Sequence, residues 1–228
     1  MTSPHLIRSL AGGGLVAIVG DVLLPFVIAA MQPGYDHVSQ YMSELGAPGR
    51  AGASFLSIWW IASGVLTIGL AVGLHLGTGR ARLAWAGPLM VAGFGLFTGI
   101  GSGLFPCDEG CLGETFSGRM HDHLNAVGAI SQLVAPGVLW LRWRKSERWW
   151  GFRSWTVAGQ VALLLSFVLF MAVGEGTHGQ VGSLAGLAQR LYQGSFYLWL
   201  AVVAAGLVRA SSTTTSWPSV NGSSTHAE

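Results

Sequence analysis

The residue types best suited to acid–base chemistry gather in three polar segments that separate long apolar stretches of the chain. In the first segment, polar side chains recur at or beside every fourth position: Asp36, His37, Gln40, Tyr41 and Glu44. Because residues four apart share one helix face, we expect a short amphipathic helix over residues 36–45, ended by Gly46 as a left-handed C′ residue. Its polar face either meets water or caps a polar cavity.

The second segment combines carboxylates with histidines: Asp108, Glu109, Glu114, His121, Asp122 and His123. Two histidines two positions apart face one ion only where the chain is extended. A zinc site is therefore an alternative, but no His-Glu-x-x-His spacing supports it, and we expect neither a metal nor a cofactor. His123 is the preferred site residue, since Asn125 and Gln132 follow it on the next apolar stretch.

The third segment contributes Glu175 and His178, and Arg190 stands at the head of the apolar stretch that follows. Arg190 is one of only three cations in or beside these polar segments. It either forms a salt bridge, with Glu175 as the candidate partner, or holds a phosphate or carboxylate through its planar guanidinium.

Both cysteines of the chain lie in the second segment, as Cys107 and Cys111. Four-residue spacing is compatible with the Cα separation of a disulfide, and a pair in an oxidising compartment usually forms one. We predict a structural disulfide. A redox-active dithiol or a pair of metal thiolates is the alternative.

Six apolar stretches must position these segments, over residues 10–30, 53–74, 83–104, 124–141, 154–174 and 187–208. A helix that crosses a bilayer needs about 20 mostly apolar residues. Only 10% of the residues are charged, against roughly 25% in soluble domains. Because the stretches lack polar helix faces, we expect an all-α integral membrane protein, a bundle of six transmembrane helices.

The charges indicate a topology. Nine of the 12 Lys and Arg residues lie near the chain ends or in the other gaps: Arg8, Arg80, Arg82, Arg142, Arg144, Lys145, Arg148, Arg153 and Arg209. The polar segments and the stretch heads beside them hold only Arg50, Arg119 and Arg190. By the positive-inside rule both termini are cytoplasmic and the protein crosses the plasma membrane several times. We expect one membrane domain over residues 1–209, with a retained signal anchor, and a disordered cytoplasmic tail over 210–228.

Asp21 is the one ionisable residue in the middle of an apolar stretch. An Asp at that depth is costly in lipid, so it faces the bundle interior and has a partner. Gln132 and Gln160 lie at comparable depths and are the candidate partners. Asp21 either handles a proton or cation or joins helices as a hydrogen-bonded group.

Three glycines of the third stretch, Gly95, Gly99 and Gly103, repeat every fourth residue. Such a face of small residues lets helix backbones approach closely in lipid. We expect this face to pack within the bundle, with a dimer interface as the alternative.

Several motifs together resemble one bacterial family. They are residues 35–49 (YDHVSQYMSELGAPG), residues 105–111 (FPCDEGC), a histidine that opens the fourth stretch, and residues 186–190 (GLAQR). The resemblance, to the integral membrane family filed as domain of unknown function nine-nine-eight, covers nearly the whole chain in order. It implies a six-helix membrane protein without an agreed activity and supplies no catalytic assignment. It suggests that the family shares Ser39, Ser43, Glu44, Asp108, His123 and Arg190.

Two classes of function remain. The first is a membrane enzyme that acts by acid–base chemistry on a lipid or prenyl substrate at the outer ends of the helices, through head-group hydrolysis or transfer or proton-initiated cyclisation. Its catalytic candidates are Glu44, Asp108, His123 and His37. Its substrate-binding candidates are Arg190, Ser39, Tyr41 and Asp21. The second class is a non-catalytic transporter, lipid-binding module or complex subunit. We expect a hydrophobic small molecule and no nucleic acid as partner, and the oligomeric state stays open.

Overall fold

The computed structural model describes residues 3–77, 84–144, 149, 151–174 and 183–212. Within this part of the chain, six helical segments are long and apolar enough to cross a membrane, as the sequence predicts. They are α1 (Pro4–Ala29), α2 (Ala53–Gly77), a composite third span, α5 (Phe116–Trp143), α6 (Phe152–Gly174) and α7 (Ala185–Ser212). The third span comprises α3 (Ala86–Phe94), the π-helix η2 (Gly95–Ile100) and α4 (Gly101–Leu104). Glu175, His178 and residues 213–228 of the predicted tail lie outside the described residues, whereas residues 210–212 continue α7.

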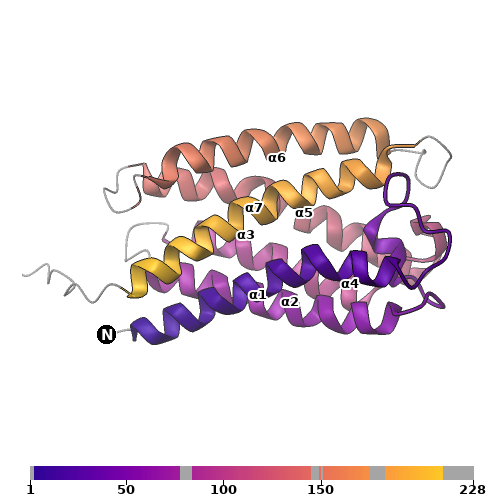
Figure 1. Cartoon of the computed structure of the whole chain (residues 1–228). Helices are drawn as coiled ribbons and strands as arrows, with labels where there is room; N and C mark the ends of the chain where they lie inside the picture. The colour runs from indigo at the N-terminus through magenta and orange to yellow at the C-terminus, as the bar shows by residue number, and fades with distance from the viewer. Residues whose placement is uncertain (1–2, 78–83, 145–148, 150, 175–182, 213–228) are drawn as a thin grey trace, which may run out of the picture.

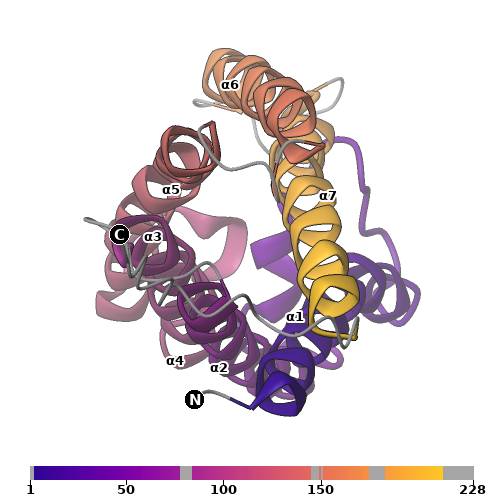
Figure 2. The same ribbon diagram turned by 90° about the vertical axis from the view of Figure 1, so that its left-hand side faces the viewer.

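The six spans run side by side, and α1 begins at the same end of the bundle at which α7 stops (Figure 1). We call this the basic end. The opposite, acidic end holds residues 30–52, residues 105–123 and the start of α7. Seen along the bundle, α6 lies at the periphery against α7 and α5, and α1 packs between α2 and α7 (Figure 2).

The glycine face of the third span packs against α2, which confirms its expected place inside the bundle. A Cβ atom built on Gly99 would lie 2.7 Å from the Cα atom of Gly64, and one on Gly103 would lie 3.0 Å from the backbone nitrogen of Ile61. These helices therefore touch through their backbones. The wider π-turn begins at Gly95, within this contact.

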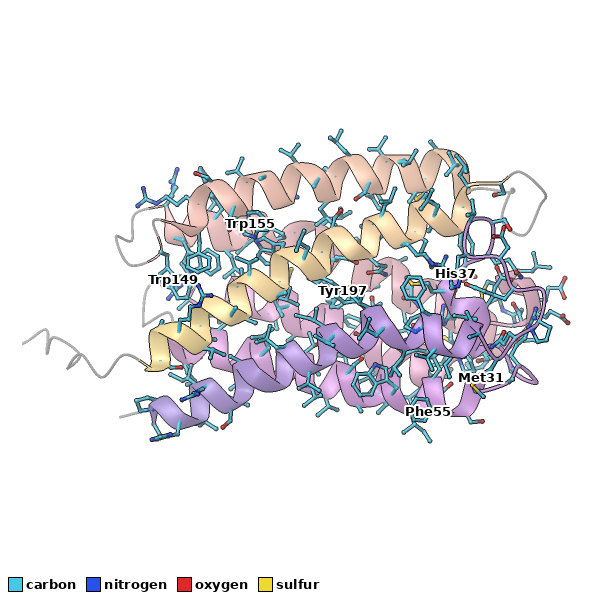
Figure 3. The ribbon with its side chains drawn as sticks, in the orientation of Figure 1. Met31, His37, Phe55, Trp149, Trp155 and Tyr197 are labelled. Carbon is cyan, nitrogen blue, oxygen red and sulfur yellow. A yellow bond between two sulfur atoms is a disulfide. The ribbon has the colours of Figure 1, made fainter. Side chains whose placement is uncertain are left out.

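Large apolar side chains fill the basic half of the bundle. The rings of Trp143 and Trp149 stack with centroids 4.9 Å apart, and both side chains are buried with Leu139 and Leu207 in one core cluster. Figure 3 shows Trp149 at this end, Tyr197 about midway along the bundle and His37 at the acidic end.

The fourth span starts eight residues before the apolar stretch that predicts it. Thr115 caps the helix, because its hydroxyl oxygen accepts a hydrogen bond from the backbone N–H of Gly118 at 2.9 Å. The polar residues 116–123 are therefore helical, and this fixes the direction in which each side chain points.

The predicted amphipathic helix over residues 36–45 is wrong. A turn precedes a single 3-10 helix, η1 (Met42–Gly46). The Asp36 carboxylate accepts hydrogen bonds from the backbone N–H of Val38 and from the Ser39 hydroxyl, at 3.1 and 2.6 Å. Such local side-chain bonds compete with helix formation. Gly46 ends η1 without adopting the left-handed conformation.

Candidate functional site

A cavity of about 500 Å³ lies in the acidic half of the bundle and is lined by residues from all six spans. This volume falls within the range of about 300–1,000 Å³ that is usual for ligand pockets. Along α5 its wall extends from His121 to Leu133, a rise of about 18 Å along a helix axis. The cavity therefore reaches from the acidic end to about the middle of the bundle.

The Asp21 carboxyl lines the cavity from α1, and the residue is 9% exposed. The indole N–H of Trp59 donates a hydrogen bond to its Oδ1 atom at 2.8 Å, and the Tyr197 hydroxyl donates to Oδ2 at 3.3 Å. Figure 3 shows Tyr197 between α7 and α1. The prediction that Asp21 faces the bundle interior and has hydrogen-bond partners is thus confirmed.

The partners that the sequence suggests for Asp21 are wrong. Gln132 instead donates to the side-chain oxygen of Gln193 on α7, at 3.1 Å. Gln160 donates to the backbone carbonyl of Leu133, also at 3.1 Å. Spacing along one helix indicates depth but does not indicate which neighbouring helix lies opposite.

Tyr192 lines the cavity, and its buried hydroxyl is unpaired in the described part of the chain. Its side chain is 3% exposed and lines the cavity, and its oxygen has no hydrogen-bond partner among the described residues. The ring lies parallel to that of Phe170, with centroids 5.9 Å apart, and it also contacts Phe167. Packing therefore fixes the ring, and the hydroxyl stays without a partner within the described residues.

Of the two neighbouring histidines on α5, His121 rather than His123 belongs to the cavity. His121 is 6% exposed, and its Nδ1 lies 2.9 Å from the carbonyl oxygen of Phe105. His123 is exposed, and its Nδ1 lies 2.6 Å from the carbonyl oxygen of Arg119 on its own helix. Because the helix begins at Phe116, the two side chains point in different directions.

Arg190 fastens the first loop to α7. Its Nη1 atom donates to the backbone carbonyls of His37 and Gln40 at 2.6 and 3.0 Å. Its Nη2 atom donates to the Tyr35 hydroxyl at 2.7 Å and lies 3.1 Å from Nδ1 of His37. These partners are uncharged, so the guanidinium holds the loop instead of pairing with a carboxylate in the described part. The suggested partner Glu175 lies outside the described residues.

The two carboxylates proposed as catalysts have local partners at the acidic end. Glu44 is 3% exposed, and its oxygens accept hydrogen bonds from the Tyr41 backbone N–H and the Gln40 side chain, both at 2.9 Å. Asp108 accepts from the backbone N–H groups of Thr115 and Gly113 at 2.8 and 3.1 Å. Burial tends to raise the pKa of Asp108, but these backbone hydrogen bonds outweigh it, so the pKa lies below its usual value.

A disulfide joins Cys107 and Cys111, whose Cα atoms are 5.0 Å apart, as predicted. The Cys111 sulfur lies 3.3 Å from the Ser43 hydroxyl of the first loop. Ser43 and Tyr41 line the cavity, and the Tyr41 ring meets Phe170 edge to face at 5.8 Å. The first two loops therefore close the cavity at the acidic end.

The family model described as "Protein of unknown function (DUF998)" matches residues 12–206. The chain belongs to this family. The match bears out the resemblance carried by the sequence motifs, and with six apolar helices it makes this a membrane protein. No curated protein and no solved structure gives a match to the chain.

In this DUF998 protein, two of the eight predicted catalytic and binding residues, Asp21 and Tyr41, line the cavity. The other six have their side chains elsewhere: Glu44, Asp108, His123, His37, Arg190 and Ser39. Ser39 is buried within the first loop, where its hydroxyl donates to Asp36. Glu44 and Asp108 thus lie in the loops at the acidic end, whereas His123 and Arg190 stand on α5 and α7 with their side chains outside the cavity. Among the described residues, no group of three His, Cys, Asp or Glu side chains is arranged to hold a metal.

Sequence reasoning missed a polar stripe on α7. Gln189, Gln193 and Tyr197 stand four residues apart and all line the cavity. The side-chain oxygen of Gln189 also accepts a hydrogen bond from the backbone N–H of Met42, at 2.6 Å. Polar residues at every fourth position of an apolar helix indicate a face turned away from lipid, so the pattern was visible in the sequence.

The cavity of the DUF998 protein reaches the side of the bundle between α5 and α6. Its exposed lining residues are Asp122, Ala126 and Ile130, four residues apart on α5, and Met171 on α6. Ile130 is 62% exposed and Met171 is 49% exposed, although both line the cavity. We call residues 122, 126, 130 and 171 the lateral opening. In a bilayer its apolar residues, 126, 130 and 171, face lipid.

Proposed function

We propose that this membrane protein takes up a hydrophobic molecule from the bilayer and holds the polar group of that molecule inside the bundle. The observation that carries the proposal is the lateral opening, where exposed apolar residues of α5 and α6 also line the cavity. A molecule dissolved in lipid reaches such an opening without crossing water.

The composition of the walls supports this function. The aromatic side chains of Phe94, Phe167 and Phe170 line the cavity and supply apolar contact area. Asp21, Gln132 and the tyrosines of α7 bring hydrogen-bonding groups to the same space. Ligand sites commonly combine an apolar wall with a few polar groups that orient the ligand.

Acid–base catalysis on the bound lipid or prenyl chain is the second candidate function, because the Asp21 carboxyl lines the cavity. Asp21 then takes the role that the sequence assigns to Glu44 or Asp108. Asp21→Asn separates the two candidates: a binding protein keeps its hydrophobic ligand, whereas an enzyme keeps the ligand and loses product formation. Conversion of the extracted lipid is measured by mass spectrometry.

We also propose that the acidic end lies outside the plasma membrane and that both termini are cytoplasmic. The excess of cations near the basic end and the disulfide at the acidic end support this orientation. A membrane-impermeant maleimide should label Pro48→Cys in intact cells and Arg144→Cys only after lysis, since both positions are exposed. The reverse labelling pattern contradicts the orientation.

The test of uptake uses three tritiated sixteen-carbon probes: hexadecanol, hexadecylamine and hexadecyl phosphate. At least one should bind the purified protein and be displaced by excess unlabelled probe. Ile130→Trp places a large ring in the lateral opening and should reduce this binding about tenfold, whereas Val127→Trp should leave it unchanged. Val127 is exposed on the same helix but does not line the cavity. The proposal is wrong if none of the three probes shows displaceable binding.

A further inference from the structure

The charges around the cavity restrict the molecule that it can hold. Among the described residues, its ionisable side chains are carboxyls, tyrosines and one histidine, and no described Lys or Arg lines it. Asp21 and Asp122 are the carboxyls. A phosphate or carboxylate in this space would lose its hydration and stand near groups of its own sign without a cation to balance them. The cavity therefore disfavours anionic head groups.

Arg190 does not supply the missing positive charge. Its side chain does not line the cavity, and both terminal nitrogens donate to acceptors of the first loop and of α7. To reach an anion in the cavity, Arg190 would have to give up these bonds and release the loop. An anionic head would thus require the acidic end to rearrange.

Among the described residues that line the cavity, one buried side-chain group has no hydrogen-bond partner. Most polar side chains there bond to protein atoms: Asp21 to Trp59 and Tyr197, Gln132 to Gln193, Asn125 to Ser102, and His121 to the Phe105 carbonyl. The Tyr192 hydroxyl is buried and has none in the described part of the chain. A buried donor without an acceptor is rare in folded proteins because it is costly.

The place of Tyr192 fits the head of a molecule that enters from the lateral opening. Phe170, which stacks on Tyr192, is next in sequence to Met171 of that opening. A polar head at the Tyr192 hydroxyl thus leaves the apolar tail among Phe167, Phe170 and Met171. The aromatic wall and the Tyr192 hydroxyl then contact the two ends of one ligand.

We infer that the ligand is a long-chain amphiphile with an uncharged oxygen head, such as an alcohol, ether or carbonyl compound, that accepts a hydrogen bond from Tyr192. The inference rests on the proposed uptake function and adds the chemical class of the head group. It assigns Tyr192 as the residue that recognises this head.

The three sixteen-carbon probes test the charge of the head. The wild-type protein should bind hexadecanol at least tenfold more tightly than hexadecyl phosphate and more tightly than hexadecylamine. Tighter binding of the phosphate overturns the inference while uptake of a hydrophobic molecule stands. Tighter binding of the amine also overturns it and indicates an ionic anchor at Asp21. If no probe binds, the proposed function itself is wrong.

Tyr192→Phe tests the donor, because it removes only the hydroxyl and keeps the ring that packs on Phe170. The variant should bind hexadecanol about five- to tenfold more weakly, the effect of one hydrogen bond. Hexadecyl methyl ether, which only accepts hydrogen bonds, should lose as much affinity as the alcohol. Hexadecane has no polar head, so its binding should be the same in the variant and the wild type. Unchanged binding of alcohol and ether by a variant with wild-type thermal stability overturns the role of Tyr192.

Discussion

The indole N–H of Trp59 on α2 donates a 2.8 Å hydrogen bond to the Asp21 carboxyl on α1. Gly20 makes this contact possible, since any Cβ atom at that position would overlap the six-membered ring of Trp59. A carboxyl near the middle of an apolar helix thus has a hydrogen-bond donor from the neighbouring helix, and Gly20 leaves room for the ring that carries this donor. The pair joins the first two spans beside the cavity, which Asp21 lines.

Trp59→Phe should destabilise the protein by about 1–3 kcal/mol, the cost of leaving a buried polar group unsatisfied. The ring of Phe keeps much of the apolar contact but has no donor for Asp21. The free energy of unfolding is measured by titration with sodium dodecyl sulfate in mixed micelles. Trp85→Phe is the control, because Trp85 is 55% exposed and its replacement should change little. Equal effects of the two replacements would contradict a special role for the Trp59 donor.

Arg190→Lys should loosen the first loop although the charge is kept. An ammonium on a flexible stem cannot reach two carbonyls, a phenol and an imidazole as a planar guanidinium does. Loss of one charge-assisted hydrogen bond costs about 2 kcal/mol, which corresponds to roughly thirtyfold faster amide exchange in the loop. Hydrogen–deuterium exchange of residues 36–46, followed by mass spectrometry, measures this change.

Arg50→Lys is the matched control for the loop experiment. Arg50 also lies at the acidic end, but its partner Glu109 is 90% exposed and 4.0 Å away. Such a surface pair contributes about 0–1 kcal/mol, so exchange in residues 36–46 should stay near the wild-type rate. If Arg190→Lys behaves like Arg50→Lys, the loop is held by other contacts.

The first loop should also loosen as the pH falls. Burial, reinforced by the positive charge of Arg190, lowers the pKa of His37, while Asp36 acts in the opposite direction. The detached loop then binds a proton at a higher pH than the packed loop. The contribution of His37 is therefore complete above about pH 6.5 and is lost as the pH falls through the lower pKa of the packed state.

His37→Asn tests this pH dependence, because its amide oxygen can accept from Arg190 without titrating. Exchange rates of residues 36–46, corrected for intrinsic exchange, should rise below about pH 6.5 in the wild type and stay level in the variant. Hydrogen bonds from Ser39 and the loop backbone lower the pKa of Asp36. Protonation of Asp36 therefore affects loop exchange only below about pH 4. A wild-type profile that is flat between these limits would show that His37 does not titrate with loop opening.

The sequence predicts the spans well because hydropathy over 20 residues is a property of each helix alone. It predicts the first loop poorly. There, the four-residue spacing of polar side chains suggests a helix, but the Asp36 carboxylate bonds to nearby backbone N–H groups. In addition, Arg190 bonds to the loop from 150 or more positions away in the chain. Neither interaction has a periodic signature, so helix spacing alone misleads.

The site shows the same division. Asp21 can be singled out from the sequence, since an acid in an apolar stretch is rare whatever surrounds it. The choice between His121 and His123 depends on where α5 begins, and an N-terminal cap at Thr115 decides this. Tyr192 stands out only in the folded chain, where its hydroxyl is buried without an acceptor.

Gly99→Ala should separate α2 from the third span. The new Cβ atom would lie 2.7 Å from the Cα and 3.1 Å from the backbone nitrogen of Gly64, and backbone atoms cannot yield as a flexible side chain can. Overpacking of this kind costs about 1–3 kcal/mol, measurable by the same detergent titration. Gly12→Ala is the control: nothing lies within 4 Å of the added atom, so helix propensity should make it neutral or stabilising by up to about 1 kcal/mol. Because Gly64 and Gly99 both line the cavity, Gly99→Ala should also weaken probe binding. Equal free energies of unfolding for the two alanine variants would show that α2 and the third span do not depend on backbone contact.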